Sequence, residues 1–163
     1  MNRQKICIIG NGLAGLVTAA VLSDENIEID LIFPKFVSHE VDHRTTAISE
    51  SNYNFLKKSL KLKNLNYIWQ SKKIDLFYQR KEKFFKFLNF SEENKTFMNI
   101  FQNSNLRKTL LKIINKKKNI KIIKETVRDI NFNKSSILIK NKNVNYDLLI
   151  LSLGTTSPLY YNV

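Results

Sequence analysis

Three of the four glycines in the chain lie in one six-residue segment, Gly10-Asn11-Gly12-Leu13-Ala14-Gly15. Between a strand and a helix, Gly10 would permit the sharp turn, Gly12 the close approach of a pyrophosphate, and Gly15 tight packing of the helix on the strand. The N–H groups at the start of such a helix attract phosphate oxygens. The segment therefore predicts a dinucleotide site, with a glycine-rich turn that only packs as the alternative.

The residues around these glycines predict the elements that such a site needs. Residues 5–9 form an apolar, mostly β-branched run typical of a buried strand. Residues 13–22 are small and apolar and are expected to be helical, and residues 27–33 alternate in the manner of a second strand. Strand, turn, helix and strand within about thirty residues have the dimensions of a βαβ unit.

One part of a dinucleotide site is missing from the expected place. An acidic residue at the end of the second strand binds the ribose hydroxyls in such units. Here the strand ends at Phe33-Pro34-Lys35, Asp30 lies three residues earlier, and Glu28 lies earlier still. Lys35 is either a partner for a 2′-phosphate, which would indicate NADP, or a solvated lysine. The departure weakens the ribose contact but leaves the pyrophosphate contact in place.

The rest of the chain predicts a mixed α/β fold. Helices are expected at about 50–60 and at 106–114, the second being amphipathic and capped by Asn103 or Ser104. Strands are expected at 74–78 and 84–88 around the turn 80–83, at 120–123, at 127–132 and 137–139 as a hairpin, and at 147–151 as a buried parallel strand. Both histidines, His39 and His43, are expected in a polar loop without the partners that a metal site needs.

The composition excludes several classes of protein. Hydrophobic residues make up 43% of the 163 residues, too many for a disordered chain, and no apolar run is long enough to span a membrane. Cys7 is the only cysteine, which excludes an internal disulfide. The start does not resemble a signal peptide, which predicts a cytoplasmic protein. The net charge of +13 reflects either an anionic partner or the coding bias of an AT-rich genome, and the scattered lysines favour a solvated surface.

The segment Asp42-His43-Arg44-Thr45-Thr46-Ala47-Ile48-Ser49 resembles a signature of the ubiquinone-biosynthesis hydroxylases, Asp-x-Arg-Thr-Thr-Ala-Leu-Ser. These enzymes are FAD-dependent monooxygenases of aromatic rings. Weaker similarity covers nearly the whole chain, including residues 98–107, which resemble the stretch before the family's long crossover helix. Two departures stand out: Leu153 replaces the aspartate of a Gly-Ala-Asp-Gly motif, and the chain ends at Val163, before the family's later Gly-Asp motif.

The resemblance implies a Rossmann-like FAD-binding domain with a parallel sheet, a β-meander or hairpin, and part of a substrate-facing antiparallel sheet. Residues 1–163 would be the N-terminal part of that domain, truncated, with the substrate-facing sheet starting at about 70–100. The cofactor-binding residues that it implies are Gly10, Gly12, Leu13, Ala14, Gly15, Arg44, Gln102 and Val127. Arg44 would contact pyrophosphate or ribose oxygens through its guanidinium, or is a surface arginine on a polar loop. Gln102 would approach the flavin, and the backbone of Val127 the adenine.

By this resemblance the complete enzyme hydroxylates a polyprenylated aromatic ubiquinone precursor with FAD, NAD(P)H and molecular oxygen, and the fragment alone is expected to be inactive. The flavin supplies the oxygen chemistry, so neither a catalytic side-chain set nor a metal is expected. Such a substrate implies contact with the periphery of the inner membrane and, as partners, other ubiquinone-biosynthesis proteins. Two alternatives stay open: a self-contained NAD(P)-binding oxidoreductase or binding module, and a basic nucleic-acid-binding protein. The latter lacks a recognisable RNA-binding motif, so no nucleic acid partner is expected.

Overall fold

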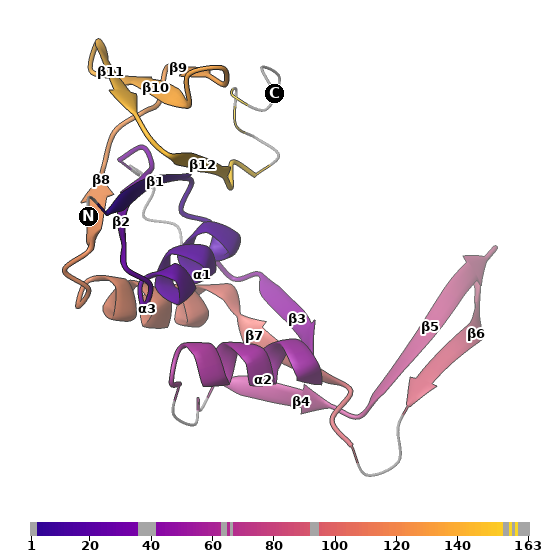
Figure 1. Ribbon diagram of the computed structural model, residues 1–163. Coiled ribbons are helices and arrows are strands. Elements are labelled where there is room, and N and C mark those ends of the chain that lie inside the picture. Colours follow the sequence, from indigo (N-terminus) through magenta and orange to yellow (C-terminus); the bar gives the residue numbers. More distant parts are fainter. Residues whose placement is uncertain are drawn as a thin grey trace. The chain divides into compact units, whose positions relative to one another are not determined.

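The computed structural model describes residues 3–35, 42–62, 65, 67–91, 95–154, 157 and 159 (Figure 1). The chain forms two compact units: Met1–Val41 with Leu106–Val163, and Asp42–Asn105. His39 lies outside the described residues, and His43 is exposed. None of the helices in the described part has the length and apolar composition needed to cross a bilayer.

The first unit is built on a four-stranded parallel sheet with the order β12-β1-β2-β8. The strands are β1 (Gln4–Ile9), β2 (Ile27–Ile32), β8 (Ile120–Ile123) and β12 (Leu148–Leu151). The apolar run of β1 is buried because this central strand has a neighbour on each side and both faces of the sheet are covered. From β1 the chain passes through α1 (Leu13–Leu22) to β2, and β12 later adds on the other side of β1. Parallel sheets bind ligands at the carboxyl end of the strands where the order changes direction, which here is the end of β1.

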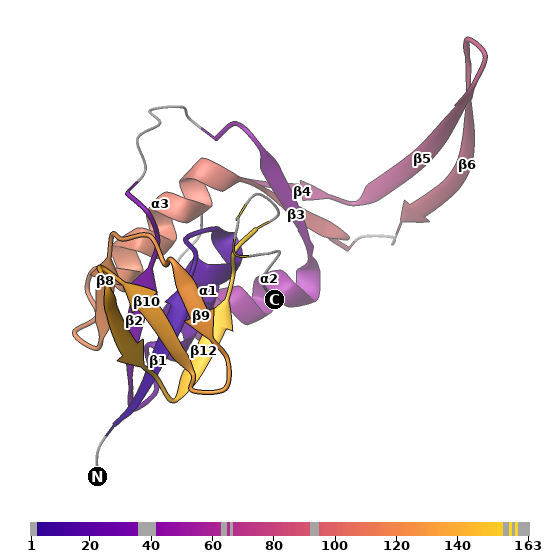
Figure 2. The ribbon, with the colours of Figure 1, turned by 90° about the horizontal axis from the view of Figure 1, so that it is seen from above.

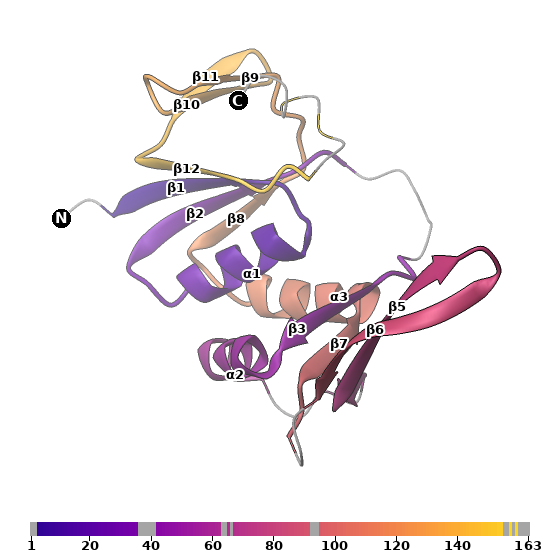
Figure 3. The same ribbon diagram turned by 90° about the vertical axis from the view of Figure 1, so that its right-hand side faces the viewer.

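A three-stranded antiparallel meander covers one face of this sheet, and α1 lies on the opposite face (Figure 3). The meander consists of β9 (Asp129–Asn131), β10 (Ser136–Ile139) and β11 (Lys142–Asn145), with β10 in the centre. Ile137 and Ile139 of β10 pack in one apolar cluster with Cys7 and Ile32 of the parallel sheet. The cluster fixes the meander on the sheet by burial of apolar surface.

The second unit contains an antiparallel sheet with the order β3-β7-β4 and a separate two-stranded ribbon. Its elements are β3 (Thr45–Ser49), α2 (Glu50–Ser59), β4 (Ile68–Ser71), the ribbon strands β5 (Lys73–Arg80) and β6 (Lys83–Ser91), and β7 (Met98–Gln102). The rings of Tyr53 from α2 and Phe101 from β7 pack with centroids 5.9 Å apart. Asn99, also of β7, is fully buried and donates from its amide to Glu50 Oε2 at 2.5 Å.

The predicted mixed α/β fold, with a parallel sheet and antiparallel strands, is confirmed. Two details of the prediction are wrong. β12 is parallel to β1 as expected, but it is not buried: Leu148 is 48% exposed, because β12 is the edge strand of its sheet. Asn103 and Ser104 do not precede the amphipathic helix but form its first turn, since α3 (Asn103–Ile114) follows β7 without a loop.

Candidate cofactor-binding site

The glycine segment forms the turn from β1 into α1, and two of its glycines are required by the fold itself. Gly10 has a φ of +116°, and a Cβ there would lie 2.1 Å from the carbonyl oxygen of Ser152. A Cβ on Gly15 would lie 2.4 Å from the carbonyl oxygen of Gly10. A side chain at either position would have to displace backbone atoms. These glycines therefore allow the turn and the close approach of α1 to the sheet.

Gly12 differs from both of its neighbouring glycines. A Cβ on Gly12 would meet no atom within 4 Å, and the residue is exposed. The fold therefore gives no packing reason for a glycine here. An open space against bare backbone is what a pyrophosphate needs in order to approach the turn.

The first turn of α1 has backbone N–H groups that find no acceptor within the helix. Gly12 is the N-cap residue and provides no side-chain cap, and the first turn contains no acidic residue. The N–H groups of Leu13, Ala14 and Gly15 have no acceptor within the helix, because they precede the first helical hydrogen bond, from Leu16 N to Gly12 O. With the partial positive charge of the helix end, this arrangement favours an anion.

Two polar side chains at the turn were not singled out by sequence reasoning. Arg107 of α3 donates from Nη1 to the carbonyl oxygen of Asn11, so a cation lies beside the turn. Asn11 is itself 8% exposed, and its Nδ2 is buried without a hydrogen-bond partner among the described residues. Unpaired buried donors are costly and are typically found at ligand-binding sites. Together with the open space at Gly12, they make the turn a fitting site for a diphosphate group.

Asp30, the acid inside β2, has a structural partner set and is not at the ligand end of the strand. Its Oδ2 accepts a hydrogen bond from the Tyr146 hydroxyl at 2.8 Å and lies 3.1 Å from Lys5 Nζ. The Lys5 ammonium also lies 5.0 Å from the centroid of the Tyr146 ring. This buried group ties the connection between β11 and β12 to the parallel sheet. Asp30 is thereby engaged, and the residues described directly after β2, Phe33-Pro34-Lys35, supply no carboxylate for a ribose.

Burial and this carboxylate also change the acidity of two neighbours of Asp30. Burial, and then the nearby charge of Asp30, raises the pKa of the Cys7 thiol to about 12. Burial and the hydrogen bond to Asp30 raise the pKa of Tyr146 as well. Both groups therefore stay protonated at neutral pH and act as packing and hydrogen-bonding groups. Val127 lies in the same apolar cluster as Cys7 and is 6% exposed.

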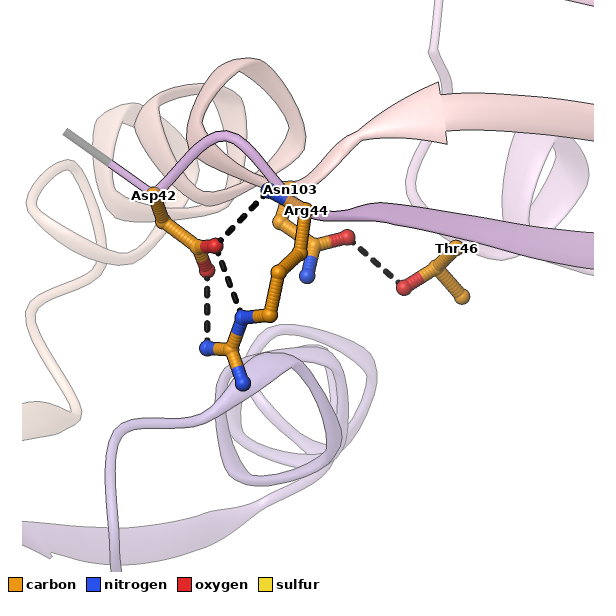
Figure 4. A network of polar contacts seen from close by, with 4 residues as sticks. All are labelled: Asp42, Arg44, Thr46 and Asn103. Carbon is orange, nitrogen blue, oxygen red and sulfur yellow. Dashed lines mark hydrogen bonds and ion pairs between the residues drawn. The ribbon is translucent and has the colours of Figure 1, made fainter.

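In the second unit, Arg44 forms a two-pronged ion pair with Asp42 (Figure 4). Arg44 Nε lies 2.8 Å from Asp42 Oδ1, and Nη2 lies 3.0 Å from Oδ2. The hydrogen bond from Arg44 lowers the pKa of Asp42 to about 2. The arginine side chain is 82% exposed, so the guanidinium is held in place by Asp42 but is still accessible.

Gln102 and Arg44 come together at one end of the β3-β7 pair. Arg44 precedes β3, and Gln102 ends β7 opposite Thr45. The link is strengthened by a backbone hydrogen bond from Asn103 N to Arg44 O at 2.9 Å. Thr46 Oγ1 also donates to Asn103 Oδ1 at 2.7 Å (Figure 4). Gln102 Oε1 accepts from Asn105 Nδ2 at 2.8 Å. The predicted site residues thus lie in both units: the glycine turn and Val127 belong to one, and Arg44 and Gln102 lie together in the other.

No known protein-family profile and no curated protein matches the chain. Solved structures do match. PqsL of Pseudomonas aeruginosa, a probable FAD-dependent monooxygenase, is 10% identical with a TM-score of 0.71, over 98% of this chain and 44% of PqsL. The chain has the fold of PqsL and of the two solved proteins that follow. FqzB gives a TM-score of 0.69 at 12% identity over 95% of this chain and 37% of FqzB. A third solved protein, 2-methyl-3-hydroxypyridine-5-carboxylic acid oxygenase, gives a TM-score of 0.63 at 14% identity over 91% of this chain and 39% of the oxygenase.

The likeness covers both units but less than half of each solved protein. At 10–14% identity it establishes the fold and no residue roles. In the described part of the chain, no group of three or more His, Cys, Asp or Glu side chains could hold a metal ion. The glycine turn, with open space at Gly12 and an uncapped helix start, fits a ligand that carries a phosphate group.

Proposed function

We propose that this chain binds FAD at the glycine turn and serves as the FAD-binding part of a monooxygenase that hydroxylates an aromatic ring. The observation that carries the proposal is the contrast among the three glycines. Gly10 and Gly15 are fixed by backbone contacts, whereas Gly12 borders open space. The fold shared with PqsL, a probable FAD-dependent monooxygenase, supports FAD over other dinucleotides.

The chain's own residues would bind and orient the cofactor. The free N–H groups of Leu13, Ala14 and Gly15 would hold the pyrophosphate, with Arg107 adding positive charge. Arg44 would contact pyrophosphate or ribose oxygens, and Gln102 would approach the flavin. When bound, the flavin would supply the oxygen chemistry, with NAD(P)H as the electron donor.

The substrate class that we propose is a polyprenylated aromatic precursor of ubiquinone. The support is the Asp42–Ser49 segment, which resembles the hydroxylase signature and which the structure orders as β3 and the turn before it. A polyprenyl substrate resides in a membrane, so the complete enzyme would meet its substrate at a lipid surface.

The first test is to titrate the purified chain with FAD, ADP and NADP and to measure binding by flavin fluorescence and calorimetry. FAD is expected to bind, and ADP to compete with it, because the contacts argued above are made with the diphosphate. Binding of NADP without binding of FAD would indicate the alternative nucleotide-binding module, with Lys35 as a partner for the 2′-phosphate. If neither FAD nor NADP binds, the proposal is wrong.

Glycine variants localise the site. Gly12→Ala is expected to fold with an unchanged melting temperature and to bind FAD at least about tenfold more weakly, which is about 1.4 kcal/mol. Gly10→Ala is the matched contrast: its Cβ collides with Ser152 O, so it should lower the melting temperature itself. If Gly12→Ala binds FAD as tightly as the unaltered chain, the cofactor does not approach this turn.

The ion pair in the second unit gives a separate test of Arg44. Asp42→Asn removes the carboxylate that engages the guanidinium and is expected to raise FAD affinity severalfold, whereas Arg44→Gln is expected to lower it. Arg44 is exposed and Asp42 is partly exposed, so this ion pair at the surface should contribute little and neither change should alter stability measurably. Identical FAD affinities in the two variants would mean that Arg44 is a surface arginine.

A further inference from the structure

The parallel sheet ends at β8, and the outer edge of this strand pairs with no other strand in the described part of the chain (Figure 2). The backbone groups of successive residues in a parallel strand point alternately to its two sides. Ile123 O accepts a hydrogen bond from Phe33 N at 3.1 Å, so the backbone groups of Ile123 face β2. By this alternation, the N–H and C=O groups of Ile122 point to the open edge. Such an edge is a template for a further strand.

A groove of about 600 Å³ lies at this open edge and is mainly basic. It is lined by residues 121–125, by Asn115 directly after α3, and by Lys140 in the turn between β10 and β11, all of them in the first unit. Lys121, Lys124 and Lys140 are exposed. Glu125 is the one carboxylate among the described lining residues, and its Oε1 lies 2.7 Å from Lys140 Nζ. Two lysines therefore leave the groove with a positive charge.

The chain segment that leads into the groove lacks acidic residues. Residues 106–124 contain eight Lys or Arg side chains and no Asp or Glu. Lys117 is ion-paired with Asp24, whereas Lys121 and Lys124 form no ion pair with any described residue. Lysines on an edge strand oppose its pairing with neutral or basic strands. The same charges attract a strand rich in carboxylates, so they select the partner while they protect the edge.

The chemistry of the groove favours a reversible partner over a permanent cover. Charged side chains such as those of Lys121 and Lys124 are stable in water, so folding does not require that they be covered. Single-stranded nucleic acid is disfavoured, because the described lining residues include no aromatic ring on which a base could stack. An extended acidic peptide uses both features of the edge, because its backbone can pair with Ile122 and its carboxylates can pair with the lysines.

We propose that an acidic segment of a partner protein binds in an extended conformation along the outer edge of β8. Lys121 and Lys124 are an odd number of residues apart, so they lie on opposite faces of the strand. Carboxylates are therefore needed on both faces of the added strand, which calls for a run of consecutive acidic residues. The groove contains none of the residues assigned to the cofactor, so this binding can succeed or fail independently of FAD binding.

The first test is to titrate the full chain with a short oligoglutamate peptide and to follow backbone amide shifts and hydrogen exchange by NMR. The Ile122 amide is expected to shift and to exchange more slowly when the peptide binds, whereas the Ile123 amide, which faces β2, should change little. Salt should weaken the binding. The same peptide methylated on alternate backbone nitrogens keeps its charge but loses the donors of one edge, so it should bind at least about fivefold more weakly.

Charge-reversal variants localise the contact. Lys121→Glu and Lys124→Glu should each weaken oligoglutamate binding at least about fivefold. Lys134→Glu is the matched control, because Lys134 is exposed in the turn between β9 and β10, outside the groove, and its reversal changes the net charge equally. All three lysines are exposed, so the melting temperature and FAD binding of the variants should match those of the unaltered chain.

Other outcomes overturn the proposal. Equal weakening by Lys121→Glu and Lys134→Glu would show general attraction of a basic protein. Equal affinities of the methylated and unmethylated peptides would show charge contacts without strand pairing. Tighter binding of oligothymidylate than of oligoglutamate would identify nucleic acid as the partner, and absence of oligoglutamate binding at low salt would leave the edge without the proposed function. FAD titration of the same samples reports on the glycine turn separately.

Discussion

The meander β9-β10-β11 and the ribbon β5-β6 are both small antiparallel elements with one apolar face, and they differ in what covers that face. In the meander, Ile137 and Ile139 are 1% and 7% exposed against the parallel sheet. In the ribbon, Phe87 is 58% exposed. Side-chain alternation therefore explains why each segment forms strands, but burial of the face depends on a second surface. The first unit supplies that surface itself, whereas the described part of the second unit does not.

The two elements differ in what their apolar residues contribute: those of the meander stabilise the fold, and those of the ribbon are available for binding. Apolar groups in the meander contribute to the free energy of folding, because unfolding exposes them to water. The aromatic groups of the ribbon are already in contact with water, so they contribute little to folding and are available for binding. Substitutions in the two elements should therefore change different measured quantities.

The largest difference is expected between Ile137→Ala and Phe87→Ala. Ile137 lies in the apolar cluster under the meander, so its truncation should lower the free energy of unfolding by about 2–5 kcal/mol. Phe87→Ala should change it by no more than about 0.5 kcal/mol, as is typical of exposed positions. Urea denaturation followed by circular dichroism measures both. Similar losses in the two variants would show that the ribbon face is covered in solution.

A smaller effect is expected from Tyr146→Phe, which removes the hydroxyl that donates to Asp30. The buried carboxylate would keep Lys5 as its partner but lose one hydrogen bond, at a cost of about 1–3 kcal/mol in the free energy of unfolding. Tyr78→Phe on the ribbon is the control, since this tyrosine is 48% exposed and should tolerate the change. If Tyr146→Phe is also neutral, the link between the meander and the sheet depends on apolar packing alone.

A third effect is alkaline destabilisation through Cys7. Its pKa is raised from 9.0 to about 12 in the folded chain, so the unfolded chain loses the thiol proton first. The stabilising contribution is complete below pH 9 and declines as the pH rises toward 12, by at most about 1.4 kcal/mol per pH unit. Denaturation at a series of pH values should show this slope in the unaltered chain and a shallower one in Cys7→Ala. Equal slopes would place the thiol in contact with water.

The parts of the structure that follow from local chemistry were predictable from the sequence. The apolar run of β1, the glycines after it, and the alternation in β5 and β6 each specify their own conformation. β7 was missed, because Asn99 interrupts its apolar alternation; its burial depends on Glu50, far away in the sequence. β3 was also missed, because the residues Thr45, Thr46 and Ser49 carry no apolar signal.

Within the candidate site, the limit of prediction lies at long-range contacts. The glycine turn is local, and its predicted position between strand and helix is confirmed. The contact of Arg107 with Asn11 and the burial of Asp30 under Tyr146 join residues separated by 96 and 116 positions. No spacing or composition in a single sequence indicates such pairs. The engagement of Asp30 by Tyr146 and Lys5 likewise became visible only in three dimensions.

The smallest expected effect lies on the polar face of the ribbon, where Asp75 is ion-paired with Lys86. Hydrogen bonding to Lys86, above all, lowers the pKa of Asp75 from 3.8 to about 2. Lys86→Gln should raise this pKa toward its ordinary value, while Lys81→Gln in the turn should not; carboxyl carbon shifts in an NMR titration measure both. Because its folded pKa is lowered, Asp75 could add stability only above its ordinary pKa, and this would be lost as the pH falls toward 2. Lys86 is exposed and Asp75 is partly exposed, so neither substitution should change the free energy of unfolding measurably. If Asp75 titrates at its ordinary pKa in the unaltered chain, the polar face is not ordered, and the division of the ribbon into two faces fails with it.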